Sequence, residues 1–420
     1  MTGPVTPAAS SHPATDDSAQ EPAHAIYLDH NATAPLDPEV LDAMMPFLVS
    51  HHGNAISGHS FGRLAGQALE TAREQVADLL DASPDELVFN SGGSEGLNHA
   101  IKGLVFARKG GPRRILFGAT EHHAVEDATR WCERFGIMAE PLPVDRHGII
   151  TPEALIRALK MGPALLVAVM WANNEVGSLQ PIAALSEICR QEGISLLCDA
   201  VQAAGKVPVS SRGLDLLAIS GHKLYGPKGV GALFVRRGLV LEPLIHGASQ
   251  EAGRRAGTHA VAQIVGLGAA AALASRTLAE EGIRQGMLRD AFEAVLLKHV
   301  PGTHVHGKQA PRLPNTSCLS FDGIVAWELQ EALDAEGVAI SAGAACRSGL
   351  PKPSPVLKAM GVNDALANGG VRFSLGRHTT EADMREVVAR VIRAVKGLRD
   401  ARNARWLTEG LASAAGKSRG

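Results

Sequence analysis

The sequence has few cysteines, and none of them is spaced for a disulfide framework or a zinc site. The five are Cys132, Cys189, Cys198, Cys318 and Cys346, with no C-x-x-C pair among them. An odd number scattered along a long chain is typical of reduced thiols in a cytosolic protein. Lysine and arginine are also missing from the start of the chain, where none precedes Arg63. Secretory signals begin with basic residues and transit peptides are rich in arginine, so we expect a cytoplasmic protein.

Long apolar runs and an excess of charge are absent as well. The longest apolar stretch, residues 263–274, is too short and too rich in glycine to span a bilayer, so we expect no membrane partner. The formal net charge is −2. The short basic cluster at residues 109–114 is typical of a solvated loop, so we expect no nucleic-acid partner. Adjacent histidines point in different directions, so the pairs at 51–52 and 122–123 predict no stable metal site.

The chain does have the length and composition of a two-domain α/β protein. Its 420 residues exceed the usual size of a single core. Residues 1–24 and 406–420 lack a periodic apolar pattern, and we expect both to be disordered tails. Asp37 and Thr151, each followed by proline and glutamate, predict the starts of two helices. The first of these helices carries an apolar face made of Val40, Leu41, Met44, Met45 and Leu48.

Short apolar runs between the helical patterns predict strands. They lie at residues 87–90, 165–171, 194–198, 216–220 and 230–235. Most are uniformly apolar, as expected for parallel strands that are covered on both faces. Most are followed by polar or glycine-bearing segments, and ligands of open parallel sheets bind beyond the carboxyl ends of the strands. We therefore expect these polar residues to converge on one site.

Two residues at these strand ends suggest a particular chemistry. Lys223, in Ser-Gly-His-Lys after an apolar strand, is flanked by small residues and could form a Schiff base with an aldehyde. Most lysines in such loops are merely solvated, so this motif alone is weak. Asp199 directly follows another strand, where a carboxylate is costly unless it is paired. The protonated ring nitrogen of pyridoxal phosphate would be such a partner, although Asp199 could equally cap a helix.

The segment Gly92-Gly93-Ser94-Glu95 lies between a predicted strand and a predicted helix. Glycine lets the backbone approach an anion, and the first turn of a helix presents unpaired N–H groups. The segment is therefore a candidate phosphate site, although glycine-rich turns of this kind are common.

With these residues in view, the sequence resembles the cysteine desulfurases from about residue 26 to residue 401. The similar segments are Tyr27-Leu-Asp-His-Asn-Ala-Thr33, Met170-Trp-Ala-Asn-Asn-Glu175, Asp199-Ala-Val-Gln202, Gly253-Arg-Arg-Ala-Gly-Thr258, Ala344-Ala-Cys-Arg-Ser-Gly349 and Pro353-Ser-Pro-Val-Leu357. These enzymes are fold-type I, class V pyridoxal-phosphate enzymes, and the most similar branch serves nitrogen fixation and general iron–sulfur cluster assembly. The resemblance implies a homodimer with a large cofactor-binding domain at 37–278, and a small domain made of 25–36 and 279–405.

For the cofactor, pyridoxal 5′-phosphate, the resemblance implies a role for each matching residue. Lys223 would bind it covalently, Asp199 would pair with the ring nitrogen, and His122 would stack on the ring and relay protons. Asn174 and Gln202 would contact the region of the phenolic oxygen. The residues that would hold the phosphate are Gly93, Ser94, Ser220 and His222, joined by Thr258 from the other subunit.

For the substrate, L-cysteine, the resemblance implies that Arg372 clamps the carboxylate, with Asn31 and Asn174 in the same pocket. Cys346 would be the nucleophile that takes the sulfur as a persulfide, leaving alanine. It lies among small residues, serine, glycine and prolines, as suits a loop that must reach the substrate and then a sulfur acceptor or iron–sulfur scaffold protein. The same thiol could transiently ligate a cluster held by that scaffold. We expect the other four cysteines to be structural.

Two alternatives remain open from the sequence. One is a selenocysteine lyase, or another class V lyase or aminotransferase, although an aminotransferase needs no thiol such as Cys346. The other is a catalytically silent scaffold, which the presence of both Lys223 and Cys346 disfavours. A yellow protein that releases alanine and sulfide from cysteine would separate these hypotheses.

Overall fold

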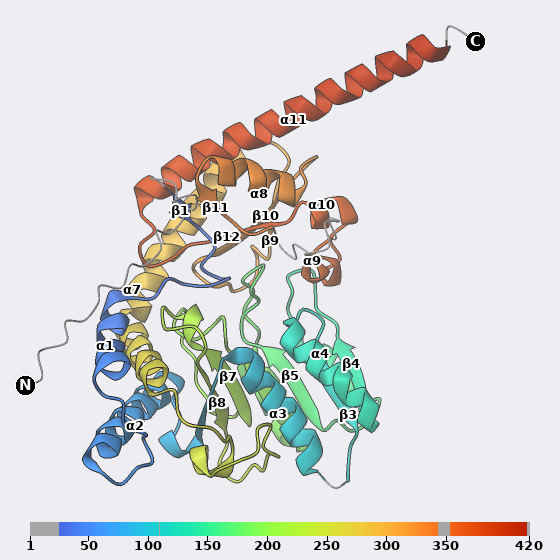
Figure 1. Ribbon diagram of the computed structural model, residues 1–420. Helices are drawn as coiled ribbons and strands as arrows, with labels where there is room; N and C mark the ends of the chain where they lie inside the picture. Colours follow the sequence, from blue (N-terminus) through green and yellow to red (C-terminus); the bar gives the residue numbers. More distant parts are fainter. Residues whose placement is uncertain (1–24, 109, 343–352, 418–420) are drawn as a thin grey trace, which may run out of the picture.

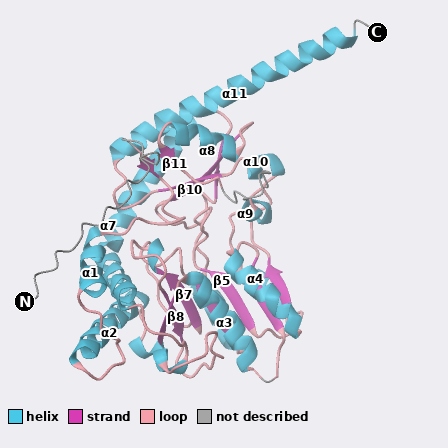
Figure 2. Cartoon of the chain, in the orientation of Figure 1, coloured by secondary structure: helices cyan, strands magenta, loops and turns pink. Residues whose placement is uncertain are grey.

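The structure is a computed structural model that describes residues 25–108, 110–342 and 353–417. The predicted tail at 1–24 lies outside the described residues, as does Cys346. A seven-stranded sheet with flanking helices forms one body, and a smaller sheet with its helices forms a second body (Figures 1 and 2). The long helix α7 (Val261–His299) runs from the first body to the second.

The large sheet has the strand order β2-β8-β7-β6-β5-β3-β4. Its strands are β2 (Leu87–Asn90), β3 (Arg114–Gly118), β4 (Met138–Leu142), β5 (Leu166–Met170), β6 (Ser195–Asp199), β7 (Leu216–Ser220) and β8 (Gly231–Val235). The five strands predicted from the sequence are all present, with ends that differ by at most one residue. Asp199 is the last residue of β6 and does not follow it.

The expectation of parallel neighbours is wrong for β8, which is antiparallel to both β2 and β7. Residues 221–230 are the whole connection from β7 to β8, and a parallel crossover needs about a dozen residues or more. Two strands of the large sheet were missed. β3 begins with an arginine, and β4 contains Glu140 and Pro141. β4 is an edge strand, where proline and charge are tolerated.

Both faces of the large sheet are buried, which explains its uniformly apolar strands. In β5, Val167 and Val169 pack into a core shared with α2, α5, α6 and α7. Leu166 and Ala168 point to the opposite face, into a core shared with α3 and α4. The helices of these two layers are α2 (Ser60–Leu80), α3 (Gly93–Ala107), α4 (His123–Trp131), α5 (Pro152–Leu159) and α6 (Ile182–Glu192).

The second body joins the start of the described chain to its end. Antiparallel strands β12 (Val371–Ser374), β10 (Thr316–Phe321) and β9 (Thr303–His306) form one sheet, and β1 (Ile26–Tyr27) pairs with β11 (Val338–Ala339) in parallel. Leu28, Phe292, Phe321 and Phe373 share its core. The surrounding helices are α8 (Ala326–Ala335), α9 (Pro355–Ala359), α10 (Asp364–Asn368) and α11 (Glu381–Lys417).

The two predicted helix starts are present. Asp37 caps α1 (Pro38–Val49) by accepting a hydrogen bond from the Glu39 N–H at 3.0 Å, and Thr151 caps α5. The predicted apolar face of α1 is buried at Val40 and Met44 alone. Leu41, Met45 and Leu48 are 41%, 43% and 53% exposed in the single chain.

The C-terminal end of the chain differs from expectation, because residues 406–417 continue α11 to Lys417 instead of forming a disordered tail. The segment from 381 to 417 contains no proline and is rich in alanine and arginine, which favour helix once a helix has begun. The last turns of α11 extend past the other elements (Figure 1).

Among the helices that the structure describes, α7 is the one long and apolar enough to cross a membrane by length and composition. Core helices of soluble proteins meet the same criterion. Here the apolar residues of α7, such as Ile264 and Leu267, pack in the core against α1 and α2.

Candidate active site

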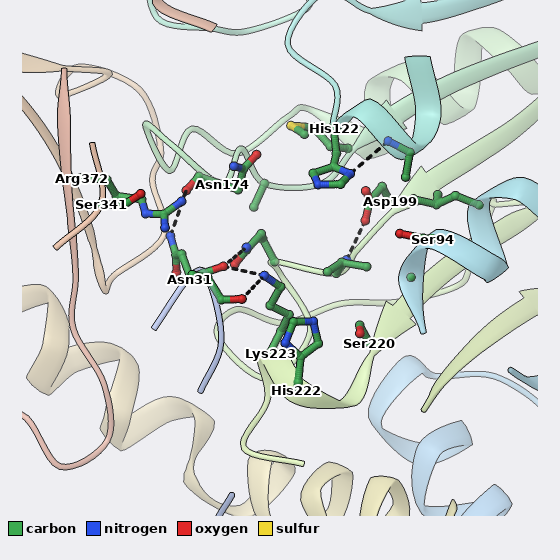
Figure 3. Close-up of a pocket in the computed structure, with 18 residues that line it drawn as sticks. Asn31, Ser94, His122, Asn174, Asp199, Ser220, His222, Lys223, Ser341 and Arg372 are labelled. Carbon is green, nitrogen blue, oxygen red and sulfur yellow. Dashed lines mark hydrogen bonds between the residues drawn. The ribbon is translucent and has the colours of Figure 1, made fainter. Parts of the chain in front are cut away.

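A cavity of about 400 Å³ lies at the carboxyl edge of the large sheet, between the two bodies of the molecule (Figure 3). It brings together nearly all of the predicted site residues: Asn31, Gly93, Ser94, His122, Asn174, Asp199, Gln202, Ser220, His222, Lys223 and Arg372. Thr258 is exposed and does not line this cavity. Cys346 lies outside the described residues. Residues from both ends of the chain therefore meet at one pocket.

The order of the sheet explains this convergence. The carboxyl ends of β2, β5, β6 and β7 lie at one edge, and the segments that follow them supply Gly93, Asn174, Gln202 and Lys223. The opposite wall of the cavity comes from the second body, where Arg372 lies on β12. A ligand in the cavity is thus enclosed by two bodies with separate cores.

The ammonium of Lys223 is held at the centre of the site. It donates hydrogen bonds to the main-chain oxygens of Asn31 at 2.6 Å and Ala32 at 2.7 Å. Burial, and next the positive charge of Arg372, lower the pKa of Lys223 to about 8. A lysine with this pKa has a useful neutral fraction near pH 7, which is what attack on an aldehyde requires. Lys228, five residues further along the chain, does not line the cavity.

Asp199 is buried at the end of β6, with one carboxylate oxygen accepting a 2.9 Å hydrogen bond from the Val201 N–H. Burial raises the pKa of Asp199 to about 6, although the Val201 N–H and Lys223 act in the opposite direction. A cation placed against this carboxylate would restore its ionised form. Asp199 is therefore suited to hold a protonated ring nitrogen.

A second buried carboxyl group, Glu121, was not anticipated. It accepts a hydrogen bond from the Met170 N–H at 2.7 Å. Its other oxygen has no partner among the described residues. Burial, with a further contribution from the charge of Asp199, raises the pKa of Glu121 well above its usual range. This shift favours the protonated form of Glu121.

His122 caps α4 and accepts a hydrogen bond from the Ala124 N–H at Nδ1, at 3.1 Å. Since Nδ1 is the acceptor, the proton of the neutral ring is at Nε2. Desolvation of the ring, and next the charge of Lys223, lower the pKa of His122. The ring is therefore neutral near pH 7, with one N–H available to a ligand.

The predicted phosphate site is formed by the first turn of α3. Gly92 has a φ of 138°, which favours glycine. A Cβ at Gly93 would lie 2.6 Å from a methyl carbon of Val201, so no larger residue fits without a shift. Ser94 and Ser220 bring hydroxyls to the same end of the cavity (Figure 3). The unpaired N–H groups of a helix start, together with hydroxyl donors, suit a bound phosphate.

Arg372 supplies a cation from the opposite wall. It pairs with Asp29 and donates a 3.0 Å hydrogen bond to the main-chain oxygen of Asn174. Its buried Nε has no partner among the described residues. Arg377, five residues further along the chain, pairs with Asp37 at 2.7 Å and does not line the cavity.

Lys206 is a third cation at the site, and the sequence reading missed it. Its Nζ donates to the side-chain oxygen of Gln202 at 2.9 Å and to the main-chain oxygen of Gln202 at 3.2 Å. Burial, and next the charges of Lys223 and Arg372, lower the pKa of Lys206 to about 7. The sequence did contain one sign of this contact, because Lys206 comes only four residues after Gln202.

The four cysteines outside the 343–352 segment are all buried. Burial raises the pKa of Cys132 to about 11 and that of Cys189 to about 12. Burial also raises the pKa of Cys198 and of Cys318, in both cases with a contribution from nearby carboxylates. These thiols stay protonated near pH 7 and are poor nucleophiles, as expected for structural cysteines.

The donor set of the cavity fits one cofactor. Lys223 and Arg372 at the cavity, with Lys206 next to it, call for anionic groups. The α3 start suits a phosphate, and Asp199 suits a protonated ring nitrogen. Pyridoxal 5′-phosphate carries a phosphate, a ring nitrogen and an aldehyde that a lysine of lowered pKa can capture. The fold and the site define a pyridoxal-phosphate-dependent enzyme of fold type I.

Comparisons with known proteins narrow this class. Residues 26–387 match the family model for class-V aminotransferases. The chain is 43% identical over 376 residues to "Cysteine desulfurase IscS" of Dictyoglomus turgidum, covering 89% of this chain and 95% of that protein. A solved "NifS-like protein" is 33% identical with a TM-score of 0.82, over 89% of this chain and 100% of its own. Another solved structure, titled "SspA in complex with cysteine", is 32% identical with a TM-score of 0.75. The match covers 84% of this chain and 99% of that one. The chain belongs to the class-V aminotransferase family and, within it, to the cysteine desulfurases.

Proposed function

We propose that this protein converts L-cysteine to L-alanine and carries the sulfur as a persulfide on Cys346, for transfer to an acceptor in iron–sulfur cluster assembly. The observation that carries the proposal is the meeting of Lys223, Asp199 and Arg372 in one cavity of a chain from this family. The similar structure whose title names bound cysteine supports the choice of substrate. Purified protein should be yellow and should release equal amounts of alanine and, with a thiol reductant present, sulfide.

Different residues of the cavity would serve the cofactor, the substrate carboxylate and proton transfer. Pyridoxal phosphate, when bound, withdraws electrons from the bonds at the substrate's α-carbon. Asp199 keeps the proton on the ring nitrogen that makes this withdrawal possible. Arg372 binds the substrate carboxylate, and the free direction of its Nε is available for that contact. Lys223 and His122 hold protons at Nζ and Nε2, where they can be donated to or taken from the substrate.

The sulfur step requires a thiolate that the buried cysteines cannot supply. In our proposal the Cys346 thiolate attacks the substrate's sulfur. An S–S bond forms, the bond between that sulfur and the substrate's β-carbon breaks, and its electron pair stays with the carbon. Protonation of that carbon gives the methyl group of alanine. A reducing thiol or an acceptor protein then removes the outer sulfur, and the same thiol could briefly ligate a cluster held by a scaffold partner.

The lowered pKa of Lys223 predicts how cofactor capture depends on pH. A neutral amine is needed, and a pKa of about 8 leaves roughly a tenth of Lys223 neutral at pH 7. We expect the rate at which cofactor-free protein captures pyridoxal phosphate to rise with pH and level off above about 8. Stopped-flow absorbance between pH 6 and 10 measures this. A rate that still rises steeply at pH 10 would mean that Lys223 has an ordinary pKa.

Replacing Arg372 with lysine should weaken substrate binding. A guanidinium binds a carboxylate through two parallel hydrogen bonds, which a single ammonium cannot reproduce. We expect KM for cysteine to rise at least about tenfold, while the absorbance of the bound cofactor changes little. Arg377→Lys is the matched control, because Arg377 already pairs with Asp37 outside the cavity. A normal KM in Arg372→Lys would assign the carboxylate to another group.

We also propose that the active protein is a cytoplasmic homodimer. Thr258, assigned to the phosphate by resemblance, is exposed and absent from this chain's own cavity, so it could act only in the cavity of a partner. Leu41, Met45 and Leu48 on α1 are exposed apolar side chains that a partner could cover. Sedimentation of the holoenzyme should give twice the mass of the chain, and a fully active monomer would refute this assignment.

A further inference from the structure

Lys206 and Gln202 form a pair whose geometry fixes the orientation of an amide in the cavity. An ammonium can only donate hydrogen bonds, so the Gln202 side-chain atom 2.9 Å from Lys206 Nζ must be the carbonyl oxygen. The amide nitrogen then points the other way, and it donates to the main-chain oxygen of Asn31 at 2.8 Å. Both contacts require the same orientation.

The amide nitrogen lies next to the group that captures the cofactor. The Asn31 oxygen that accepts from Gln202 also accepts from Lys223 Nζ at 2.6 Å. Gln202 lines the cavity with Lys223. A ligand oxygen that lies beside Lys223 would therefore meet an N–H of Gln202. If the amide were flipped, the ligand would meet a carbonyl oxygen, which repels an anion.

The charged groups around Lys206 do not by themselves favour a buried ammonium at this position. The charged groups that act on its ammonium are two cations, Lys223 and Arg372. The ionisable groups around this corner of the cavity also include Asp29 and His30 after β1, Asp199 on β6, and His222 before Lys223. Burying a third ammonium beside two cations is unfavourable unless an anion compensates it. Lys206 makes two hydrogen bonds to Gln202, and we therefore look to Gln202 for its role.

We infer that Lys206 is a positioning residue, which locks the Gln202 amide with its N–H toward the cavity, so that the site selects a cofactor whose phenolic oxygen is ionised. The inference rests on the proposed use of pyridoxal phosphate and deepens it. Lys206 does not line the cavity, so its hydrogen bonds act on a ligand there through Gln202. Two consequences follow: weaker cofactor binding without Lys206, and a higher pH for ionisation of the bound phenol.

The experiment measures the affinity of cofactor-free protein for pyridoxal phosphate by equilibrium dialysis. Lys206→Met, which keeps the apolar stem, should weaken binding about tenfold, because hydrogen bonds that involve a charged group are lost. Lys206→Arg, which keeps a donor, should recover most of that loss. Lys308→Met, a change at an exposed lysine, should bind like the wild type. If Lys206→Met is unstable by circular dichroism, Lys206→Ala takes its place.

A double-mutant cycle with Gln202→Ala tests whether Lys206 acts through the amide. Once Gln202 is gone, Lys206→Met should cause no further loss of affinity. The absorbance of the bound cofactor should change to its protonated-phenol form at a higher pH in Lys206→Met than in the wild type. Equal losses in both backgrounds, or an unshifted absorbance titration, would overturn the inference. A wild-type protein that binds no pyridoxal phosphate would instead refute the proposed function.

Discussion

Replacing Lys223 with alanine should abolish covalent attachment of the cofactor and lower turnover by at least about 1,000-fold. Lys223 is the lysine whose Nζ reaches into the cavity, held there by the Asn31 and Ala32 oxygens. The two other candidate amines are poorly placed. Lys228 lies outside the cavity, and Lys206 is hydrogen-bonded to Gln202 behind it.

Reduction with borohydride followed by peptide mass mapping measures this directly, because it fixes the cofactor to the lysine that carries it. The wild-type protein should carry the label on the peptide that contains Lys223, and Lys223→Ala should carry none. Lys228→Ala serves as the control and should keep both label and turnover. A label on Lys206 or Lys228 in the wild type, or normal turnover in Lys223→Ala, would contradict the assignment.

The part of the site that could be predicted lies where strands end. Asp199, Lys223 and Asn174 follow short apolar runs that predict buried strands, and the carboxyl ends of parallel strands meet at one edge. Their convergence therefore follows from patterns that are visible along the chain. Recognition of Arg372 required the resemblance, because nothing in the short apolar context of β12 marks that arginine as part of a distant cavity.

What could not be predicted depends on tertiary burial. Glu121 and Lys206 are ordinary polar residues in the sequence, and their importance appears once burial has shifted their pKa values. The reversal of β8 was missed because an antiparallel strand covered on both faces is as uniformly apolar as a parallel one, although the short connection at residues 221–230 was a visible sign of it. The extension of α11 was missed because helix propensity, without an apolar period, is a weak signal.

Replacing Cys346 with serine should separate cofactor chemistry from sulfur transfer. Serine keeps the size and polarity of the side chain but removes the sulfur nucleophile. Contacts among the described residues already hold Lys223, Asp199 and Arg372 at the cavity, so cysteine should still bind and change the absorbance of the cofactor. Alanine release should fall by at least about 100-fold. Cys198→Ser is the matched control, because its buried, protonated thiol is not a nucleophile.

The location of the persulfide tests the central claim most directly. Protein incubated with ³⁴S-labelled cysteine and no reductant, then alkylated and digested, is mapped by mass spectrometry. We predict one labelled sulfur for each chain, on the peptide that contains Cys346, with one alanine released for each sulfur bound. Labelled sulfur on Cys132, Cys189, Cys198 or Cys318, or alanine released at the normal rate by the Cys346→Ser protein, would contradict the account.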